Sequence, residues 1–286
     1  MSQIAEQIAV QTNTPVLHEE IIHENTLYAE PIAHIGSFAI TNSLMTSALG
    51  LIIIVTLSLL IKKSIKKVPT GLQNAMEMII EGFLGIFDSV TGSRKKSLKF
   101  APVVLSFFFF ILINNWLGLI PGVGSIGQIV QHGDEKLFIP YLRGGTADLN
   151  TTLALATLGV VLSHIIGVFA LGWWKYLNKF INIKAFLEIP GKIMKDPMII
   201  FVNPIKFFVG IIEIISELAK VASLSFRLFG NIFAGEVLLA SMSAILAFGI
   251  PIPFMFLEVL VGLIQALIFA MLIITYLTIN TTAEEH

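Results

Sequence analysis

The chain alternates between long apolar stretches and shorter polar segments. Five of the apolar stretches exceed the ~20 residues that a helix needs to cross the hydrocarbon core of a bilayer. They occupy residues 38–61, 100–121, 149–173, 205–249 and 251–280. The pattern therefore predicts an all-α polytopic membrane protein with five membrane-crossing helices.

Residues 71–91, between the first two crossings, follow a different pattern. Apolar side chains recur there at helical spacing, and acidic or amide side chains occupy other positions. The apolar set is Leu72, Met76, Ile79, Ile80, Phe83, Leu84 and Phe87. The acids within this segment favour an amphipathic helix in the membrane interface over a further crossing.

The fourth stretch is too long for an ordinary crossing. As one helix it would extend roughly 65–70 Å, whereas the hydrocarbon core is only ~30 Å thick. A break near Gly230 would leave residues 237–250 as a separate crossing, and that segment is too short. We therefore predict one long, strongly tilted helix, which forms a hairpin with the last helix through a turn at residues 249–253.

Composition agrees with a membrane protein, and the charges predict its orientation. The chain is 55% hydrophobic and 13% charged, whereas a typical soluble domain is about 25% charged. Segments 62–99 and 174–206 hold the great majority of the Lys and Arg residues outside the crossings, and residues 1–37 hold none. By the positive-inside rule the basic segments face the cytoplasm. We expect the N-terminal tail, residues 1–37, outside and the C-terminus in the cytoplasm.

Polar side chains interrupt the last two crossings. On a helical projection of the long helix, one face carries Glu213, Glu217, Lys220, Ser223, Arg227 and Asn231. Glu236 lies on the side opposite Arg227, about 13 Å further along. On the last helix, Glu258 and Gln265 share a face, and we expect Gln265 near Arg227 in the hairpin.

Charged side chains are costly inside a membrane, and acids and arginine differ in whether they can avoid that cost. A charged side chain at the bilayer centre costs roughly 2.5–3.5 kcal/mol on insertion scales. A carboxyl group can avoid that cost by binding a proton, but arginine stays charged. Arg227 is therefore a fixed cation, and Glu213, Glu236 and Glu258 are candidate proton exchangers.

Three further residues have two interpretations each. Glu217 and Lys220 either pair and join helices or belong to a polar path. His164 lies within the third crossing and either bonds to a neighbouring helix or lines a hydrophilic passage.

No motif points to nucleotide chemistry, a cofactor or a metal. Residues 122–127 match GxGxxG, but they follow a helix and Pro121, whereas a dinucleotide site needs a preceding strand. His18 and His23 are one residue too far apart for a zinc-binding HExxH helix. Since Cys is also absent, we expect no cofactor, no metal site, no catalytic residue and no nucleic-acid partner.

The segment around the arginine, SFRLFGNIFAGE at residues 225–236, resembles the signature of subunit a of the F-type ATP synthase membrane sector. The likeness continues at residues 264–269, 275–277 and 284–286, and at Asn114, Asn115, Pro121 and residues 147–153. It covers residues 38–286.

The resemblance implies a proton-channel stator with two offset half-channels, which couples proton translocation to rotation and ATP synthesis. In that family Arg227 would separate the two half-channels, Glu236 would be a half-channel acid, and Glu213 a second channel residue. Gln265 would be the partner near Arg227. Glu258 stands where the family often has histidine, so an acid pair with Glu236 would share a proton, and proton versus sodium coupling stays open.

The resemblance also implies the partners. These are the c-subunit ring, the b subunits of the peripheral stalk, the F1 sector indirectly, and the lipid bilayer of a bacterial inner (plasma) membrane. The chain would be non-catalytic alone and part of a proton-transporting ATPase. The alternative is a cation/proton secondary transporter, a class that often shows repeated halves and paired broken helices; the sequence shows neither.

Overall fold

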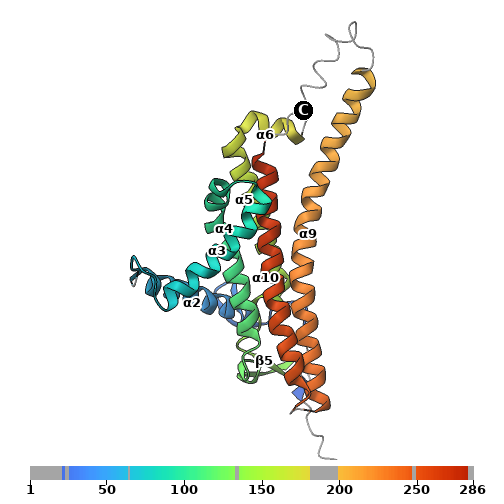
Figure 1. The fold of residues 1–286 in the computed structure, drawn as a ribbon. Helices are drawn as coiled ribbons and strands as arrows, with labels where there is room; N and C mark the ends of the chain where they lie inside the picture. The colour runs from blue at the N-terminus through green and yellow to red at the C-terminus, as the bar shows by residue number, and fades with distance from the viewer. Residues whose placement is uncertain are drawn as a thin grey trace, which may run out of the picture.

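The computed structural model describes residues 21–22, 26–63, 65–132, 135–180, 199–246 and 249–282. Helices dominate it (Figure 1). The long helices are α2 Asn42–Lys63, α3 Leu72–Thr91, α4 Arg94–Gly118, α5 Leu149–Leu171, α9 Ile199–Ile245 and α10 Pro251–Thr281. Within the described residues, five of these, all except α3, are apolar and long enough to cross a membrane. This confirms the prediction of an all-α polytopic membrane protein with five spanning helices.

The fourth apolar stretch is a single helix, as expected. α9 has 47 residues and runs without a break past Gly230. It begins at Ile199, before Pro204, and so starts earlier than the predicted residue 205. Gly249 has a φ of 99° in the turn to α10, a conformation that favours glycine. Figure 1 shows the resulting hairpin, with the N-terminal part of α9 leaning away from α10.

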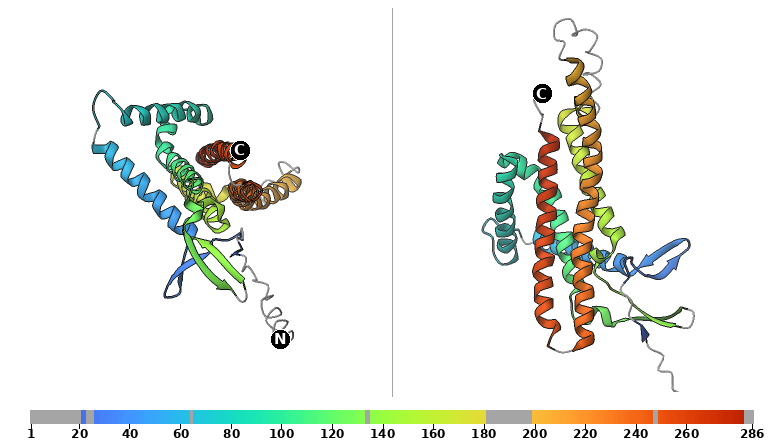
Figure 2. Two further views of the ribbon diagram at one scale, coloured as in Figure 1. Left: turned by 90° about the horizontal axis from the view of Figure 1, so that it is seen from below. Right: turned by 90° about the vertical axis from the view of Figure 1, so that its right-hand side faces the viewer.

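The packed centre of the molecule is formed mainly by α4, α5, α9 and α10. α10 packs against each of the other three, and α3 packs along α4. The buried side chains include the aromatic group Phe83, Phe87, Phe107, Phe108 and Phe269. α2 is different, because most of its apolar side chains are not buried within the protein. Figure 2 shows α2 extending away from the bundle. Its apolar surface is therefore left for lipid.

α3 has the amphipathic character that the sequence predicts. It turns Phe83, Leu84 and Phe87 inward and leaves its acidic side chains at positions 77 and 81 exposed. It ends at Gly92, whose left-handed φ of 66° closes the helix with a backbone bond to Asp88. α3 is connected to α4 through this turn. α4 begins at Arg94, ahead of the predicted residue 100, and ends at Gly118, short of residue 121.

The start of the first predicted crossing is wrong. Residues 38–41 form strand β3 (Phe38–Thr41), which pairs antiparallel with β2 (Pro31–Ile35), and α2 begins only at Asn42. A short apolar run next to a helix cannot be assigned to helix or strand by hydrophobicity alone. Gly36, with a φ of 63°, supplies the turn that allows the hairpin.

Further strands lie in the segment between α4 and α5. β4 (Gly127–His132) and β5 (Glu135–Pro140) form a hairpin, and β1 (Ile21–Ile22) runs parallel to β5. The strands gather at the end of the molecule where α9 turns into α10 (Figures 1 and 2). The residues that match GxGxxG form the 3₁₀ turn η1 (Val123–Ser125) before β4. Most of the predicted tail, and residues 181–198 of a predicted basic loop, lie outside the described residues.

The third predicted crossing is slightly too long. α5 ends at Leu171, and Gly172, with φ 86° and ψ 147°, breaks the helix. Trp173 therefore belongs to the short helix α6 (Trp173–Phe180), which lies beside the C-terminal end of α10 (Figure 1). The break at Gly172 brings α6 back against α5 and α9.

Candidate functional site

Arg227 stands on the outward side of α9. Its neighbours Leu224 and Leu228 are buried, and Ser225 lies 3.3 Å from the hydroxyl of Thr152 on α5. Arg227 itself is exposed and makes no hydrogen bond or ion pair with any residue that the structure describes. Asn231, one turn further on, is also exposed. An exposed arginine in an apolar helix requires a polar partner or water outside the described chain.

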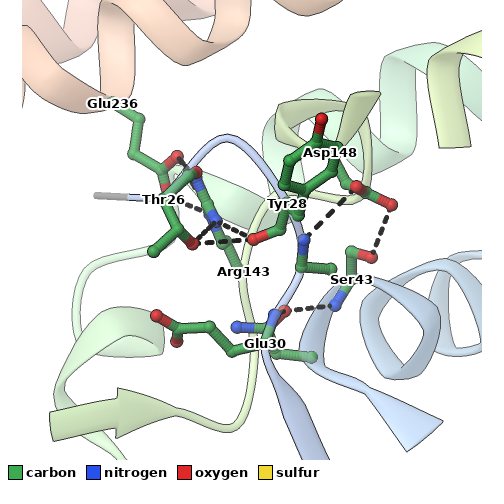
Figure 3. A network of polar contacts seen from close by, with 9 residues as sticks. Thr26, Tyr28, Glu30, Ser43, Arg143, Asp148 and Glu236 are labelled. Carbon is green, nitrogen blue, oxygen red and sulfur yellow. Dashed lines mark hydrogen bonds and ion pairs between the residues drawn. The ribbon is translucent and has the colours of Figure 1, made fainter. Parts of the chain in front are cut away.

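A polar cluster near the α9–α10 turn centres on Glu236. It is called the outer cluster because the orientation predicted from the sequence places this turn outside. The Glu236 carboxylate accepts hydrogen bonds from Arg143 at 2.8 Å from Nη2 and at 3.0 and 3.1 Å from Nε (Figure 3). The Arg143 side chain is only 5% exposed, whereas that of Glu236 is 29% exposed. The acid is thus open on one side and held by a buried cation on the other.

The chain segment before β2 holds this cluster from the other side. Arg143 donates to the backbone carbonyls of Thr26 at 2.8 Å and Tyr28 at 3.2 Å. Ala29 in turn donates to the carboxylate of Asp148, which also accepts from Ser43. Asp148 caps the N-terminus of α5 by accepting from the backbone of residues 150 and 151. Figure 3 shows the contacts of Arg143 with Glu236, Thr26 and Tyr28, and those of Asp148 with Ser43 and the segment after Tyr28.

Glu258 lies on α10 beside this cluster and is nearly fully buried. A Cβ atom on Gly235 would come within 2.1 to 2.2 Å of its carboxylate carbon and oxygens, so the carboxylate rests directly against the backbone of α9. Its Oε1 atom is buried and has no hydrogen-bond partner among the described residues. The predicted proton-sharing pair is not formed here, because the Glu236 carboxylate points to Arg143. Glu258 instead contacts α9 at Gly235, the residue before Glu236.

Gln265 is buried on α10, two turns from Glu258, but no hydrogen bond joins it to Arg227 within the described residues. The nearby stretch of α10 is fixed to α4 by Asn115, whose amide donates to the carbonyl of Gly262 at 3.0 Å. Asn115 also accepts a hydrogen bond from Thr146 in the 3₁₀ turn η2 (Gly145–Ala147). These contacts set the position of the α10 face that carries Glu258.

An inner polar cluster forms toward the start of α9. Glu217 accepts from Lys220 at 2.7 Å and lies 3.3 Å from Nε2 of His164 on α5. Nδ1 of His164 is hydrogen-bonded to the hydroxyl of Tyr176 on α6. Lys220 also lies 5.0 Å from the ring centre of Tyr276 on α10. Glu217 and Lys220 therefore do pair, and they do so within a polar cluster to which four helices contribute. Their place in a polar path stays a prediction.

Tyr176 joins this cluster through its hydroxyl, which is hydrogen-bonded to His164. Burial raises the pKa of its hydroxyl, and the charges of Glu217 and Glu213 act in the same direction. A protonated hydroxyl can donate to Nδ1 of His164, which leaves Nε2 to carry the hydrogen that faces Glu217. The histidine thus connects the hydroxyl on α6 to the acid on α9.

The two clusters are separated along α9 by Arg227. From Glu217 to Arg227 the helix rises roughly 15 Å, and from Arg227 to Glu236 roughly 13 Å. Glu213 is half-buried at the inner end, and Ser223 is exposed between the inner cluster and the arginine. Within the described residues, no group of three or more His, Asp or Glu side chains is placed to hold a metal.

Sequence reasoning missed two residues of these clusters. Arg143 is one of two bases in residues 122–148, between the second and third predicted crossings, and a base retained where such residues are scarce was itself a signal. Tyr176 gave no signal, since its contact with His164 depends on the break at Gly172.

Comparison with known proteins gives the family. The model of the ATP synthase A chain family matches residues 43–278. The chain belongs to that family. It is 33% identical to ATP synthase subunit a of Geobacter sulfurreducens over 236 residues, 82% of this chain and 85% of the relative. It is 30% identical to ATP synthase subunit a of Syntrophobacter fumaroxidans over 267 residues, 92% of this chain and 95% of the relative.

Membership of this family establishes the general role. The chain is the proton-channel stator subunit of the Fo sector and part of the ATP synthase complex. Its bacterial relatives and its five apolar helices make it a multi-pass protein of a bacterial plasma membrane. Nothing in the fold favours the secondary-transporter alternative.

Proposed function

We propose that the two polar clusters are the ends of two separate proton paths and that Arg227 divides them. The observation that carries the proposal is the position of Arg227, exposed and unpaired within the described residues, between clusters at different heights on one helix. A fixed cation there repels a passing proton and attracts a carboxylate from outside the chain. That carboxylate would belong to a ring of c subunits facing this side of α9.

The outer path would run through Glu236 and Glu258. Glu236 is partly open to the surroundings and Glu258 is buried behind it, which is the order that stepwise transfer inward requires. Gln265 and Asn231 would line the approach to the ring. The buried guanidinium of Arg143 next to Glu236 opposes a bound sodium ion, so we assign the proton as the coupling ion.

The inner path would run past Ser223 to the cluster of His164, Glu217 and Lys220, with Glu213 at its mouth. Glu217 and His164 are both able to exchange protons, and they are 3.3 Å apart. A proton released near Arg227 would thus find acceptors on the cytoplasmic side. The orientation, with the N-terminus outside and the C-terminus inside, is part of this proposal and rests on the positive-inside bias.

The remaining partners follow from the same role. The b subunits would hold the chain against the F1 sector, in which ATP is made. α2, with its exposed apolar surface, and α3, with its exposed acidic face, are the surfaces available for lipid and for such a stalk.

The test is the replacement Arg227→Ala in the complete enzyme, reconstituted in vesicles. We expect proton-driven ATP synthesis to be lost, since nothing would then force the arriving ring carboxyl to release its proton. Arg94→Gln is the matched control, because Arg94 pairs with Asp88 at an exposed site at the first residue of α4 and belongs to neither cluster. Near-normal synthesis by the Arg227 variant would overturn the proposal.

A further inference from the structure

Arg143 is held far more firmly than a loop arginine needs to be. Its backbone N–H donates to the hydroxyl of Thr46 on α2 at 3.1 Å. Its guanidinium donates to carbonyls of residues 26 and 28, to the Thr26 hydroxyl at 3.3 Å, and to both oxygens of Glu236. Segments far apart in the sequence thus fix one buried cation at one place (Figure 3). A rigid cation gives a carboxylate a defined, two-point docking position.

Other ionisable groups lie around the pair of Arg143 and Glu236, but each of them is bonded or placed elsewhere. Asp148 is occupied as the cap of α5, and Glu30 lies on the segment leading into β2 (Figure 3). Tyr28 contributes its backbone carbonyl to Arg143. Glu258 faces the backbone at Gly235, the residue directly before Glu236. Arg143 is therefore the cation that Glu236 meets, and Glu258 is the buried acid that packs against α9 at the preceding residue, Gly235.

We propose that Arg143 is a positioning residue that docks the Glu236 carboxylate and thereby sets the outer proton concentration at which the outer path loads. The proposal rests on the proposed function of Glu236. While Glu236 is ionised, it stays docked on Arg143 and faces the outside. When a hydronium ion donates a proton to the carboxylate, the charge that binds it to Arg143 is gone and the side chain can turn.

The second step returns the site to its starting state. Neutral Glu236 gives its proton to an ionised Glu258, which becomes neutral, and Glu236 is again a carboxylate that docks on Arg143. Proton and charge balance, and Arg143 neither gains nor loses a proton, because a guanidinium group stays charged in proteins. Arg143 acts only through Glu236 and does not touch the ring carboxylate.

The experiment measures proton-driven ATP synthesis by the complete enzyme in proteoliposomes. The outer pH is varied at fixed inner pH and fixed membrane potential, and the maximal rate and the pH at half the maximal rate are recorded. Removing an opposite charge at this distance changes proton binding by about one pH unit or more. For Arg143→Gln we expect the half-rate point to move up by about one unit, a tenfold lower proton concentration. Arg143→Lys keeps the positive charge and should therefore bring the half-rate point most of the way back to that of the unmodified enzyme.

Two further variants keep the test decisive if Arg143→Gln fails to assemble. Glu236→Asp keeps the arginine but withdraws the carboxylate by about 1.5 Å, one carbon–carbon bond. It should move the half-rate point in the same direction. Arg94→Gln, in an exposed ion pair at the first residue of α4, should leave the half-rate point unchanged. A merely structural arginine would lower the maximal rate in its variants without moving that point.

The outcomes separate this inference from the function on which it rests. If Glu236→Gln leaves synthesis intact, the proposed outer path itself is refuted. If Glu236→Gln impairs synthesis while neither Arg143→Gln nor Glu236→Asp moves the half-rate point, only the role of Arg143 is refuted. The double variant Arg143→Gln with Glu236→Gln should be no slower than Glu236→Gln alone, because the arginine acts through that acid.

Discussion

Gly235 provides a sharp test of the contact between α9 and Glu258. A methyl group at this position would lie 2.1 Å from the carboxylate carbon of Glu258, and ordinary contact begins at 3.4 Å. Gly235→Ala must therefore displace the carboxylate by at least 3.4 − 2.1 = 1.3 Å, or part the two helices. Because the acid is the flexible end of a side chain, we expect the fold to survive and the carboxylate to move.

The expected effect on function is large. Misplacing a reacting group by about 1 Å can cost as much as a hundredfold in rate. We expect Gly235→Ala to lower proton-driven ATP synthesis in vesicles by about tenfold to a hundredfold. Gly82→Ala is the control, since Gly82 lies in a helix with no atom within 4 Å of the added methyl group. It should synthesise ATP at the normal rate.

A second change identifies the cause. Glu258→Asp shortens the acid by about 1.5 Å, which exceeds the required displacement. Combined with Gly235→Ala, it should recover part of the lost rate. The reasoning is refuted if Gly235→Ala synthesises ATP as fast as Gly82→Ala, or if the shorter acid makes the variant slower still.

The other predictions concern the support of the outer cluster and the chemistry of the inner one. Asp148→Ala removes the α5 cap and the acceptor for Ala29 and Ser43. The change should lower the free energy of unfolding by about 2 kcal/mol. The measurement is the unfolding midpoint of the purified membrane sector, which should fall; an unchanged midpoint would contradict the prediction. Asp148→Asn should lose less, since its side-chain oxygen can still cap. Glu217→Gln should slow ATP-driven proton pumping severalfold, measured against Arg94→Gln as control; equal rates would argue against the inner path.

The large features of the fold could be predicted because each is encoded by a long, regular pattern of apolar residues. The hairpin of α9 and α10 could be predicted because more than 70 residues are almost free of helix-breaking signals, with one Gly-Pro turn between them. The strands were missed because runs of four to six residues, such as β3 and β4, carry too little pattern to separate strand from helix. Their pairing is decided by tertiary contacts.

The candidate site divides in the same way. Arg227, Glu236 and Glu258 were found because a charge in an apolar helix is visible at once. Arg143 was not connected with Glu236, because 93 residues separate them and only the folded chain brings them to 2.8 Å. The pairing of Lys220 with Glu217 is local, three residues apart on one helix, and so could be anticipated.

The continuity of α9 explains why two clusters can be near each other in sequence and still not exchange protons. One unbroken helix fixes Glu217 and Glu236 roughly 28 Å apart along its axis, far beyond the reach of a hydrogen bond. Arg227, near the midpoint, is exposed and cannot accept a proton, so it closes the direct route along the helix surface. A break at Gly230 would have let the two halves move independently and lose this spacing. Under the proposed function, a proton can pass from one cluster to the other only on a carrier that moves past the arginine.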